Sequence, residues 1–209
     1  RFLGGVEPNT VRLNSKRKSF ACWHDDESRH TNGVTVTLID GTTIDAALLV
    51  GSDGIFSTVR RQLEIPGDRL NYVGLVVVLG IVDDSVLKVP LTARRIFETV
   101  DGATRIYAMP FTTSSTMWQL SFPASEDDAR RLSKNTSTLK DEIVRRCTQW
   151  HDPIPELLRC TPLDCMSGYP VYDRELLEPD VLRRKNGNGV TLTPQRRVTL
   201  IGDAAHPMT

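Results

Sequence analysis

The chain of 209 residues lacks several features that would assign it to well-known classes of protein. It carries no net charge, since 26 basic residues balance 26 acidic ones, and this argues against a broad electrostatic surface for nucleic acid or lipid. No apolar run approaches the ~20 residues that span a bilayer, and the amino end has no signal-peptide pattern. We therefore expect a cytoplasmic protein without a transmembrane segment or a nucleic-acid partner.

Cysteine is also scarce. The four cysteines form no CxxC pair, and the histidines do not complete a zinc-binding spacing, so we predict no metal site. Reduced thiols are the expected state, with a disulfide between Cys160 and Cys165 left open as an alternative.

Hydrophobic alternation predicts a β-rich first third. Strands are expected at 20–23 and 34–39, and the second runs into the tight-turn signal Asp40-Gly41. The run 44–50 ends in continuous apolar residues, which is typical of a strand covered on both faces in a parallel sheet. A glycine-rich turn at 51–54 follows, and then Ser57 caps a short helix over 58–63.

The middle of the chain has a different pattern. Strands are expected at 72–82, 94–100, 104–109, 116–122 and 167–172, and a buried strand is expected at 198–201. One helix begins at Ser125, and a second carries Leu139, Ile143 and Cys147 on one face until Pro153 and Pro155 end it. We predict an α/β (α+β) fold in three segments, 1–70, 71–180 and 181–209.

Two of the expected strands end in a turn that contains glycine and Asp: Gly51-Ser52-Asp53-Gly54 follows Val50, and Ile201-Gly202-Asp203 follows Leu200. In open α/β sheets, ligands sit outside the carboxyl ends of the strands. An Asp there can accept hydrogen bonds from sugar hydroxyls, and a neighbouring glycine lets the backbone approach a ligand closely. A single such Asp is more often a turn residue or a helix cap, so only the pair indicates a cofactor site.

The same segments carry a family resemblance. GSDGIFSTVR at 51–60 is similar to the DG motif, GADGxxSxVR, of the FAD-dependent monooxygenases related to para-hydroxybenzoate hydroxylase and salicylate hydroxylase. LIGDAAHPM at 200–208 resembles the start of their second FAD fingerprint, GDAAHxxxPxxGxG. GYPVYDREL at 168–176 and WQLSFP at 118–123 resemble segments that lie between these motifs. The resemblance implies part of an FAD-binding Rossmann-like layer, with an inserted, mainly antiparallel substrate-side sheet and helices.

It also implies roles for single residues. Asp203 would accept a hydrogen bond from a ribityl hydroxyl of FAD, Gly202 would permit close approach, and Pro207 would lie near the isoalloxazine ring. The residues expected at the cofactor are Asp53, Gly54, Arg60, Gly202, Asp203, Ala204 and Pro207. Arg60 suits a phosphate of NADPH or NADH, but an ion pair with a nearby Asp is an equal alternative. His206 is expected to pack at the site rather than act as a general base, so no catalytic residue is assigned.

A substrate pocket is expected among Met109, Phe111, Trp118 and Tyr172. Trp118, Leu120 and Phe122 share one strand face, and Met109 and Phe111 lie on a neighbouring strand. Ordinary core packing is the stronger alternative for these residues. Tyr172 and Arg174 belong either to a brace beside the flavin or to a salt-bridged loop.

The implied activity is a monooxygenase that uses FAD, NADPH or NADH, and molecular oxygen. A flavin hydroperoxide would insert one oxygen atom into an aromatic or polycyclic organic substrate. A non-oxygenating reductase or dehydrogenase and a non-catalytic remnant are the alternatives. The chain begins at Arg1 without GxGxxG and ends at Thr209 within the second fingerprint, so we expect a fragment that binds FAD weakly or not at all and is inactive alone.

Overall fold

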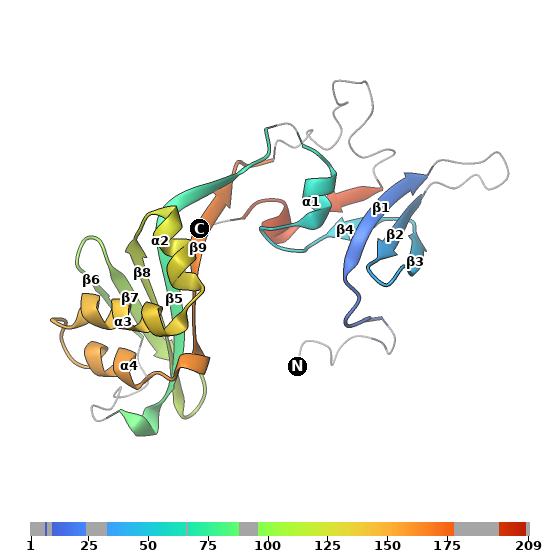
Figure 1. Cartoon of the computed structure of the whole chain (residues 1–209). Coiled ribbons are helices and arrows are strands. Elements are labelled where there is room, and N and C mark those ends of the chain that lie inside the picture. The colour runs from blue at the N-terminus through green and yellow to red at the C-terminus, as the bar shows by residue number, and fades with distance from the viewer. Residues whose placement is uncertain are drawn as a thin grey trace. The chain divides into compact units, whose positions relative to one another are not determined.

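The computed structural model describes residues 7, 10–23, 33–65, 67–87, 96–177 and 197–207 (Figure 1). The chain divides into two compact units, of which the first comprises Arg1–Leu70 and Arg174–Met208 and the second comprises Asn71–Asp173. The segment boundary expected at residue 180 lies outside the described residues.

The first unit contains a three-stranded antiparallel sheet in the order β1-β2-β3. The strands are β1 (Arg17–Trp23), β2 (Gly33–Leu38) and β3 (Thr43–Ala46). Gly41 adopts a φ of +86° between β2 and β3, as the turn signal at this position requires. The strands expected at 20–23 and 34–39 are therefore present.

A separate pair of parallel strands completes the first unit. β4 (Leu49–Gly51) pairs with β10 (Val198–Leu200), and α1 (Thr58–Gln62) follows β4. The single strand expected over 44–50 is wrong, because the chain leaves the antiparallel sheet after β3 and joins a different sheet at β4. Val50 is 41% exposed, so the described part of the chain does not cover both faces of β4.

The second unit contains a five-stranded sheet in the order β6-β7-β8-β5-β9. Its strands are β5 (Leu70–Asp83), β6 (Phe97–Val100), β7 (Arg105–Pro110), β8 (Ser115–Pro123) and β9 (Met166–Arg174). β8 pairs antiparallel with both β5 and β7, and β6 pairs antiparallel with β7. The expected mainly antiparallel sheet is confirmed, although Arg94 and Arg95 of the strand expected at 94–100 lie outside the described residues.

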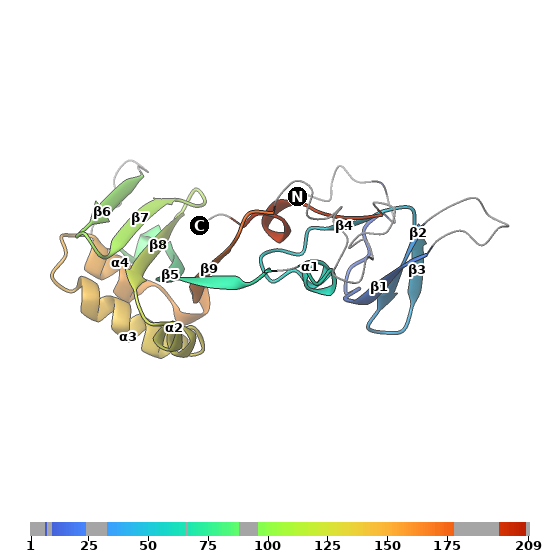
Figure 2. The same ribbon diagram turned by 90° about the horizontal axis from the view of Figure 1, so that it is seen from above.

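Three helices cover one face of this sheet (Figure 2). They are α2 (Glu126–Ser133), α3 (Thr136–Cys147) and α4 (Ile154–Cys160). Ser125 caps α2, and the predicted stripe of Leu139, Ile143 and Cys147 is buried. The helix that carries this stripe ends at Cys147, before Pro153 and Pro155, as predicted. The sequence did not predict α4, which begins at these prolines, where a missing backbone N–H costs nothing. Short 3₁₀ turns occur at Asp84–Val86, Leu163–Cys165 and Gly202–Ala204.

The core of the second unit lies between the sheet and these helices. Every second residue of β8 is buried, namely Thr116, Trp118, Leu120 and Phe122. Trp118 has no exposed surface, and its indole Nε1 donates to Thr161 Oγ1 at 2.8 Å. A Cβ built on Gly80, the cross-strand partner of Trp118, would lie 2.3 Å from the indole ring, so the indole occupies the space that a side chain at Gly80 would need.

These features confirm the predicted α/β (α+β) fold class. All four cysteines are free, so the alternative of a disulfide between Cys160 and Cys165 is not realised. Among the described residues, no helix is long and apolar enough to cross a membrane.

Candidate functional site

The two turns that contain glycine and Asp, 51–54 and 201–203, begin at the same edge of the first unit. β4 and β10 are parallel and in register, with Thr199 opposite Val50 and Leu200 opposite Gly51. The amide of Ile201 donates to the carbonyl of Gly51 at 2.9 Å, which extends the pairing up to the turns. Because parallel strands end at a common edge, the structure brings together two motifs that lie about 150 residues apart in the chain.

Glycine is needed at this edge for two different reasons. At Gly51 a Cβ would lie 2.7 Å from Leu200 Cδ2 and 2.9 Å from Val59 Cβ, so only glycine allows α1 to pack this closely on the two strands. Gly54 and Gly202 instead adopt φ angles of +75° and +56°, which strain any residue with a side chain. No atom lies within 4 Å of a Cβ built on either residue, so the backbone of both turns faces open space.

Asp53 organises the first turn by capping α1. Its carboxylate accepts from the Ser57 hydroxyl, from the Thr58 amide at 2.7 Å and from the Thr58 hydroxyl at 2.9 Å. The Val59 amide adds a longer contact at 3.3 Å. Partial burial on its own would raise the pKa of Asp53, but the hydrogen bonds from Ser57 and Thr58 outweigh it and hold this pKa below its usual value. Asp53 is therefore an ionised helix cap that fixes the turn, while a direct contact with a cofactor stays a prediction.

Arg60 is buried, and its guanidinium contacts the backbone directly after the second turn. Its side chain is 1% exposed, and its Nη2 lies 2.8 Å from Asp68 Oδ1. Its Nη1 donates to the carbonyls of Ala204 at 3.0 Å and Ala205 at 2.6 Å. The ion pair weighed from the sequence is thus present in the structure. Contact with a nucleotide phosphate remains a prediction, and the burial of the guanidinium does not favour it.

Asp203 is the group at this edge with a free side chain. It is exposed, and its carboxylate makes no hydrogen bond or ion pair with the rest of the described chain. Ala204 and Pro207 are buried, and the His206 amide donates to the Gly202 carbonyl at 2.9 Å, which closes the turn. An unpartnered carboxylate beside an open glycine backbone fits the hydroxyl groups of a cofactor such as FAD. The roles of these residues toward FAD stay predictions.

The predicted substrate residues separate onto two faces of the second unit's sheet. Trp118 pairs across the strands with Ala108 on the helix-covered face, whereas Met109 pairs with Met117 on the opposite face. Grouping Trp118 with Met109 in one pocket is therefore wrong, and for Trp118 the alternative of core packing describes what is observed. The reason is the two-residue period of strands, since the register between two strands cannot be read from either strand alone.

The other two predicted pocket residues also differ in their surroundings. Phe111 follows β7 and is 58% exposed. Tyr172 is 8% exposed, its hydroxyl donates to Glu126 Oε1 at 2.8 Å, and its ring meets that of Tyr72 edge-on with centroids 5.6 Å apart. Contact with a substrate stays a prediction for Met109, Phe111 and Tyr172.

Sequence reasoning did not identify the sheet face opposite the helices as one surface. The strand register places partly exposed side chains on this open face, namely Leu79, Ile81, Tyr107, Met109, Met117 and Gln119. The alternation within β8 carried the necessary signal, because its partly buried residues 117, 119 and 121 must face away from Trp118. The open face is apolar around Met109, Met117 and Ile81, and it also carries polar groups, namely the Tyr107 phenol, the Gln119 amide, the Ser121 hydroxyl and the Arg105–Glu98 ion pair.

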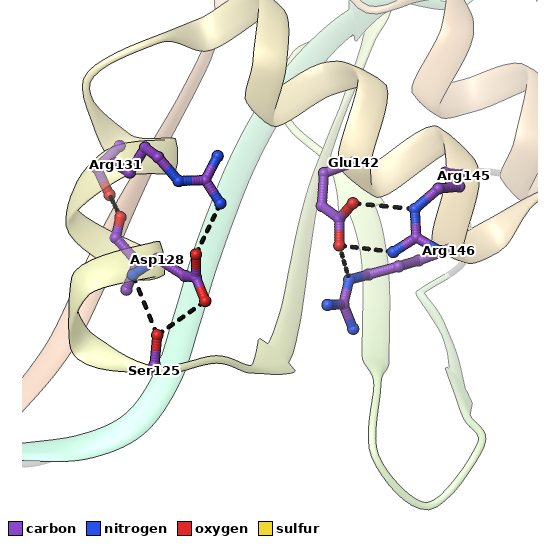
Figure 3. Close-up of polar contacts among 8 residues, drawn as sticks. Ser125, Asp128, Arg131, Glu142, Arg145 and Arg146 are labelled. Atoms are coloured by element: carbon purple, nitrogen blue, oxygen red, sulfur yellow. Dashed lines mark hydrogen bonds and ion pairs between the residues drawn. The ribbon is translucent and has the colours of Figure 1, made fainter.

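A surface cavity of about 440 Å³ in the second unit is a poor candidate for the site. Figure 3 shows the ion pairs formed by the arginines that line it. It lies beside α2 and α3 and contains none of the predicted site residues. Arg131 is paired with Asp128 at 2.7 Å, and Arg145 and Arg146 share Glu142 at 2.8 and 2.7 Å. Since these arginines are already compensated by carboxylates, the cavity presents little uncompensated charge to attract an ion.

The structure defines an α/β protein in which two glycine turns meet at one edge of the first unit and a helix-backed sheet forms the second unit. Comparisons with known proteins identify its relatives. No protein-family model matches the chain. It is 32% identical over 181 residues to aurachin C monooxygenase/isomerase of Stigmatella aurantiaca, covering 85% of this chain and 41% of that protein. It is 30% identical to chloroplastic zeaxanthin epoxidase of Nicotiana plumbaginifolia, covering 84% of this chain and 23% of that protein.

A solved structure shows the same fold. HpxO of Klebsiella pneumoniae, complexed with FAD and uric acid, matches with a TM-score of 0.67 at 23% identity over 93% of this chain and 43% of HpxO. The chain thus spans less than half the length of these relatives. The chain is related to the FAD-dependent monooxygenases, and the resemblance to the para-hydroxybenzoate hydroxylase and salicylate hydroxylase-like superfamily is confirmed.

Proposed function

We propose that this protein is an FAD-dependent monooxygenase that uses NADPH or NADH and molecular oxygen to insert one oxygen atom into a small organic substrate. The observation that supports this most is the pair of glycine turns on adjacent parallel strands, where the Asp203 carboxylate has no partner among the described residues. The two relatives found by sequence are named as a monooxygenase/isomerase and an epoxidase, and the structural neighbour HpxO is solved with FAD.

The chain's own residues would bind and orient the cofactor. Asp203 would accept hydrogen bonds from the ribityl hydroxyls, and Gly202 would let the cofactor approach the backbone. Asp53 would act indirectly, by fixing the turn that carries Gly54. FAD, when bound and reduced, supplies the oxygen chemistry, while the protein supplies position and a dry environment.

We propose that the substrate binds at the open face of the second unit's sheet. Met109, Met117 and Ile81 offer an apolar surface there, and the Tyr107 hydroxyl lies 3.3 Å from Gln119 Oε1 as a polar group beside it. Such a surface suits a flat aromatic or polycyclic molecule with one or a few polar groups. HpxO is solved with uric acid, a flat bicyclic molecule that carries more polar groups than this surface could meet by itself.

Oxygen uptake by the intact protein tests the proposed function. The protein is saturated with FAD and given NADPH or NADH with a panel of aromatic and polycyclic compounds. A monooxygenase will consume oxygen and reduced nucleotide in equal amounts and will form an oxygenated product. Oxidation of the nucleotide without an oxygenated product would indicate a non-oxygenating flavoprotein instead, and failure to bind FAD would overturn the proposal altogether.

The chain of 209 residues provides a second test. We expect it to bind FAD weakly or not at all when purified alone, because it lacks the GxGxxG turn that would hold the pyrophosphate. The absorbance spectrum of the purified chain checks this expectation, and a stoichiometric yellow flavin band would contradict it. The cytoplasmic location expected from the sequence stays part of the proposal.

A further inference from the structure

We propose that Asp68 is a positioning residue of the cofactor site, which holds the two glycine turns in place through a pair of buried arginines. This inference rests on the FAD site proposed above. Asp68 carries no motif, and nothing in the sequence singled it out.

Asp68 is the shared partner of two arginines that come from distant parts of the chain. Its Oδ1 accepts from Arg60 Nε at 3.0 Å and Nη2 at 2.8 Å, and its Oδ2 accepts from Arg174 Nη1 at 2.8 Å. The exposed fractions of the Asp68, Arg60 and Arg174 side chains are 11%, 1% and 9%. Charged groups this well covered by protein are held in one geometry and are little screened by solvent.

Each arginine extends the contact to one of the turns. Arg174 Nε donates to the carbonyl of Ile55 at 3.0 Å, directly after Gly54. Arg60 Nη1 donates to the carbonyls of Ala204 and Ala205, directly after Asp203. A continuous series of hydrogen bonds therefore runs from the first turn through Arg174, Asp68 and Arg60 to the second turn.

The charges make Asp68 the central member of this series. Two buried guanidinium groups that face one carboxylate leave a net positive charge, and removal of the carboxylate leaves two cations without compensation. We expect the arginines then to separate and to release the carbonyls of Ile55, Ala204 and Ala205. Since the second turn carries Asp203, its movement would displace the free carboxylate that is to meet FAD.

The test is an FAD titration of the intact protein, followed by quenching of flavin fluorescence. Asp68→Asn keeps the shape of the side chain and removes its charge. We expect it to raise the Kd for FAD by about tenfold to a hundredfold, the range found when residues that orient ligands are lost. Asp40→Asn is the matched control, because Asp40 forms an exposed ion pair with Arg12 at 3.9 Å in the same unit. The control should leave the Kd unchanged.

A second variant and a local measurement separate positioning from folding. Arg174→Lys retains a cation for Asp68 but cannot also reach the Ile55 carbonyl with a second donor, so it should raise the Kd for FAD without unfolding the unit. Hydrogen exchange should accelerate in the peptide that covers Gly202–Pro207 and stay unchanged in β2 and β3. If Asp68→Asn accelerates exchange in β2 and β3 as well, that variant has lost more than the position of the turns. The Kd of Arg174→Lys for FAD then tests the inference in its place.

Wild-type affinity for FAD in folded Asp68→Asn and Arg174→Lys proteins would overturn the inference while leaving the proposed function intact. Absence of FAD binding by the wild-type protein would instead remove the proposed function, and the inference with it. The two failures are thus distinguishable in the same titration.

Discussion

The two units of the chain are stabilised by different kinds of interaction. The second unit has an apolar core between its sheet and three helices, in which Trp118, Ile106 and Leu157 are completely buried. The first unit has a smaller apolar cluster around Val59 and Leu200, and the largest of its fully buried side chains is that of Arg60.

The parallel strands of the first unit also leave apolar side chains exposed. In the first unit, Leu48, Val50 and Ile201 around the parallel strands are 48%, 41% and 51% exposed. Burial of apolar surface is the main source of stability, so the second unit resembles a self-sufficient scaffold, and the first depends more on polar contacts and on what binds to it.

The largest expected effect tests the scaffold character of the second unit. Trp118→Ala should lower the free energy of unfolding by about 3–5 kcal/mol, because it leaves a large cavity beside Gly80 and removes the partner of Thr161. Urea denaturation measures this loss. Met109→Ala, on the opposite face of the adjacent strand, is the control and should cost about 1 kcal/mol or less. Equal losses for the two variants would contradict the assignment of the faces.

Arg60→Lys tests whether the first unit depends on its buried polar contacts. Lysine cannot reproduce the fork of donors to Asp68, Ala204 and Ala205, so we expect a loss of about 3 kcal/mol from carbonyls left without partners. Thermal unfolding and the KM for NADPH should be measured together. A raised KM with unchanged stability would instead show that Arg60 serves the nucleotide phosphate.

Asp203→Ala should have the opposite pattern, a loss of binding without a loss of stability. The carboxylate is exposed and unpartnered within the described chain, so its removal leaves no buried group unsatisfied. A hydrogen bond to a charged group contributes about 2 kcal/mol, which corresponds to roughly a thirtyfold rise in the Kd for FAD. The fluorescence titration measures this change, and a fall in the unfolding temperature without FAD would count against a ligand-binding role.

The smallest effect concerns the cap of α1. The folded-state pKa of Asp53 is lowered, so its contribution to stability is present above the unfolded-state value near 3.9 and disappears as the pH falls through the folded-state value. Asp53→Asn should therefore cost about 0.5–1 kcal/mol at neutral pH, a modest amount because solvent screens the site. Urea denaturation at neutral pH and at successively lower pH checks this, since the difference between the wild-type protein and the variant should begin to shrink below about pH 4. A constant difference would show that charge is not involved.

Strand positions and the two motifs were largely predictable from the sequence, because alternation and glycine turns are local signals. The run 44–50 was misassigned because a continuous apolar stretch does not reveal where a chain passes from one sheet to another. The role of Pro155 was missed although proline is common in the first turn of a helix. Trp118 and Met109 could not be assigned to different faces without the register between β7 and β8. The ion pair between Asp68 and Arg174 joins residues more than 100 positions apart, so no local signal in the sequence predicts it.

The close contact between Gly80 and Trp118 has an evolutionary consequence. Because the indole occupies the space above Gly80, neither position can change alone: any side chain at 80 collides with the ring, and a smaller residue at 118 opens a void. The two positions should therefore covary among relatives, with a larger residue at one accompanied by a smaller residue at the other. A variant that pairs Gly80→Ala with a smaller side chain at 118 should be less damaged than the sum of its single substitutions.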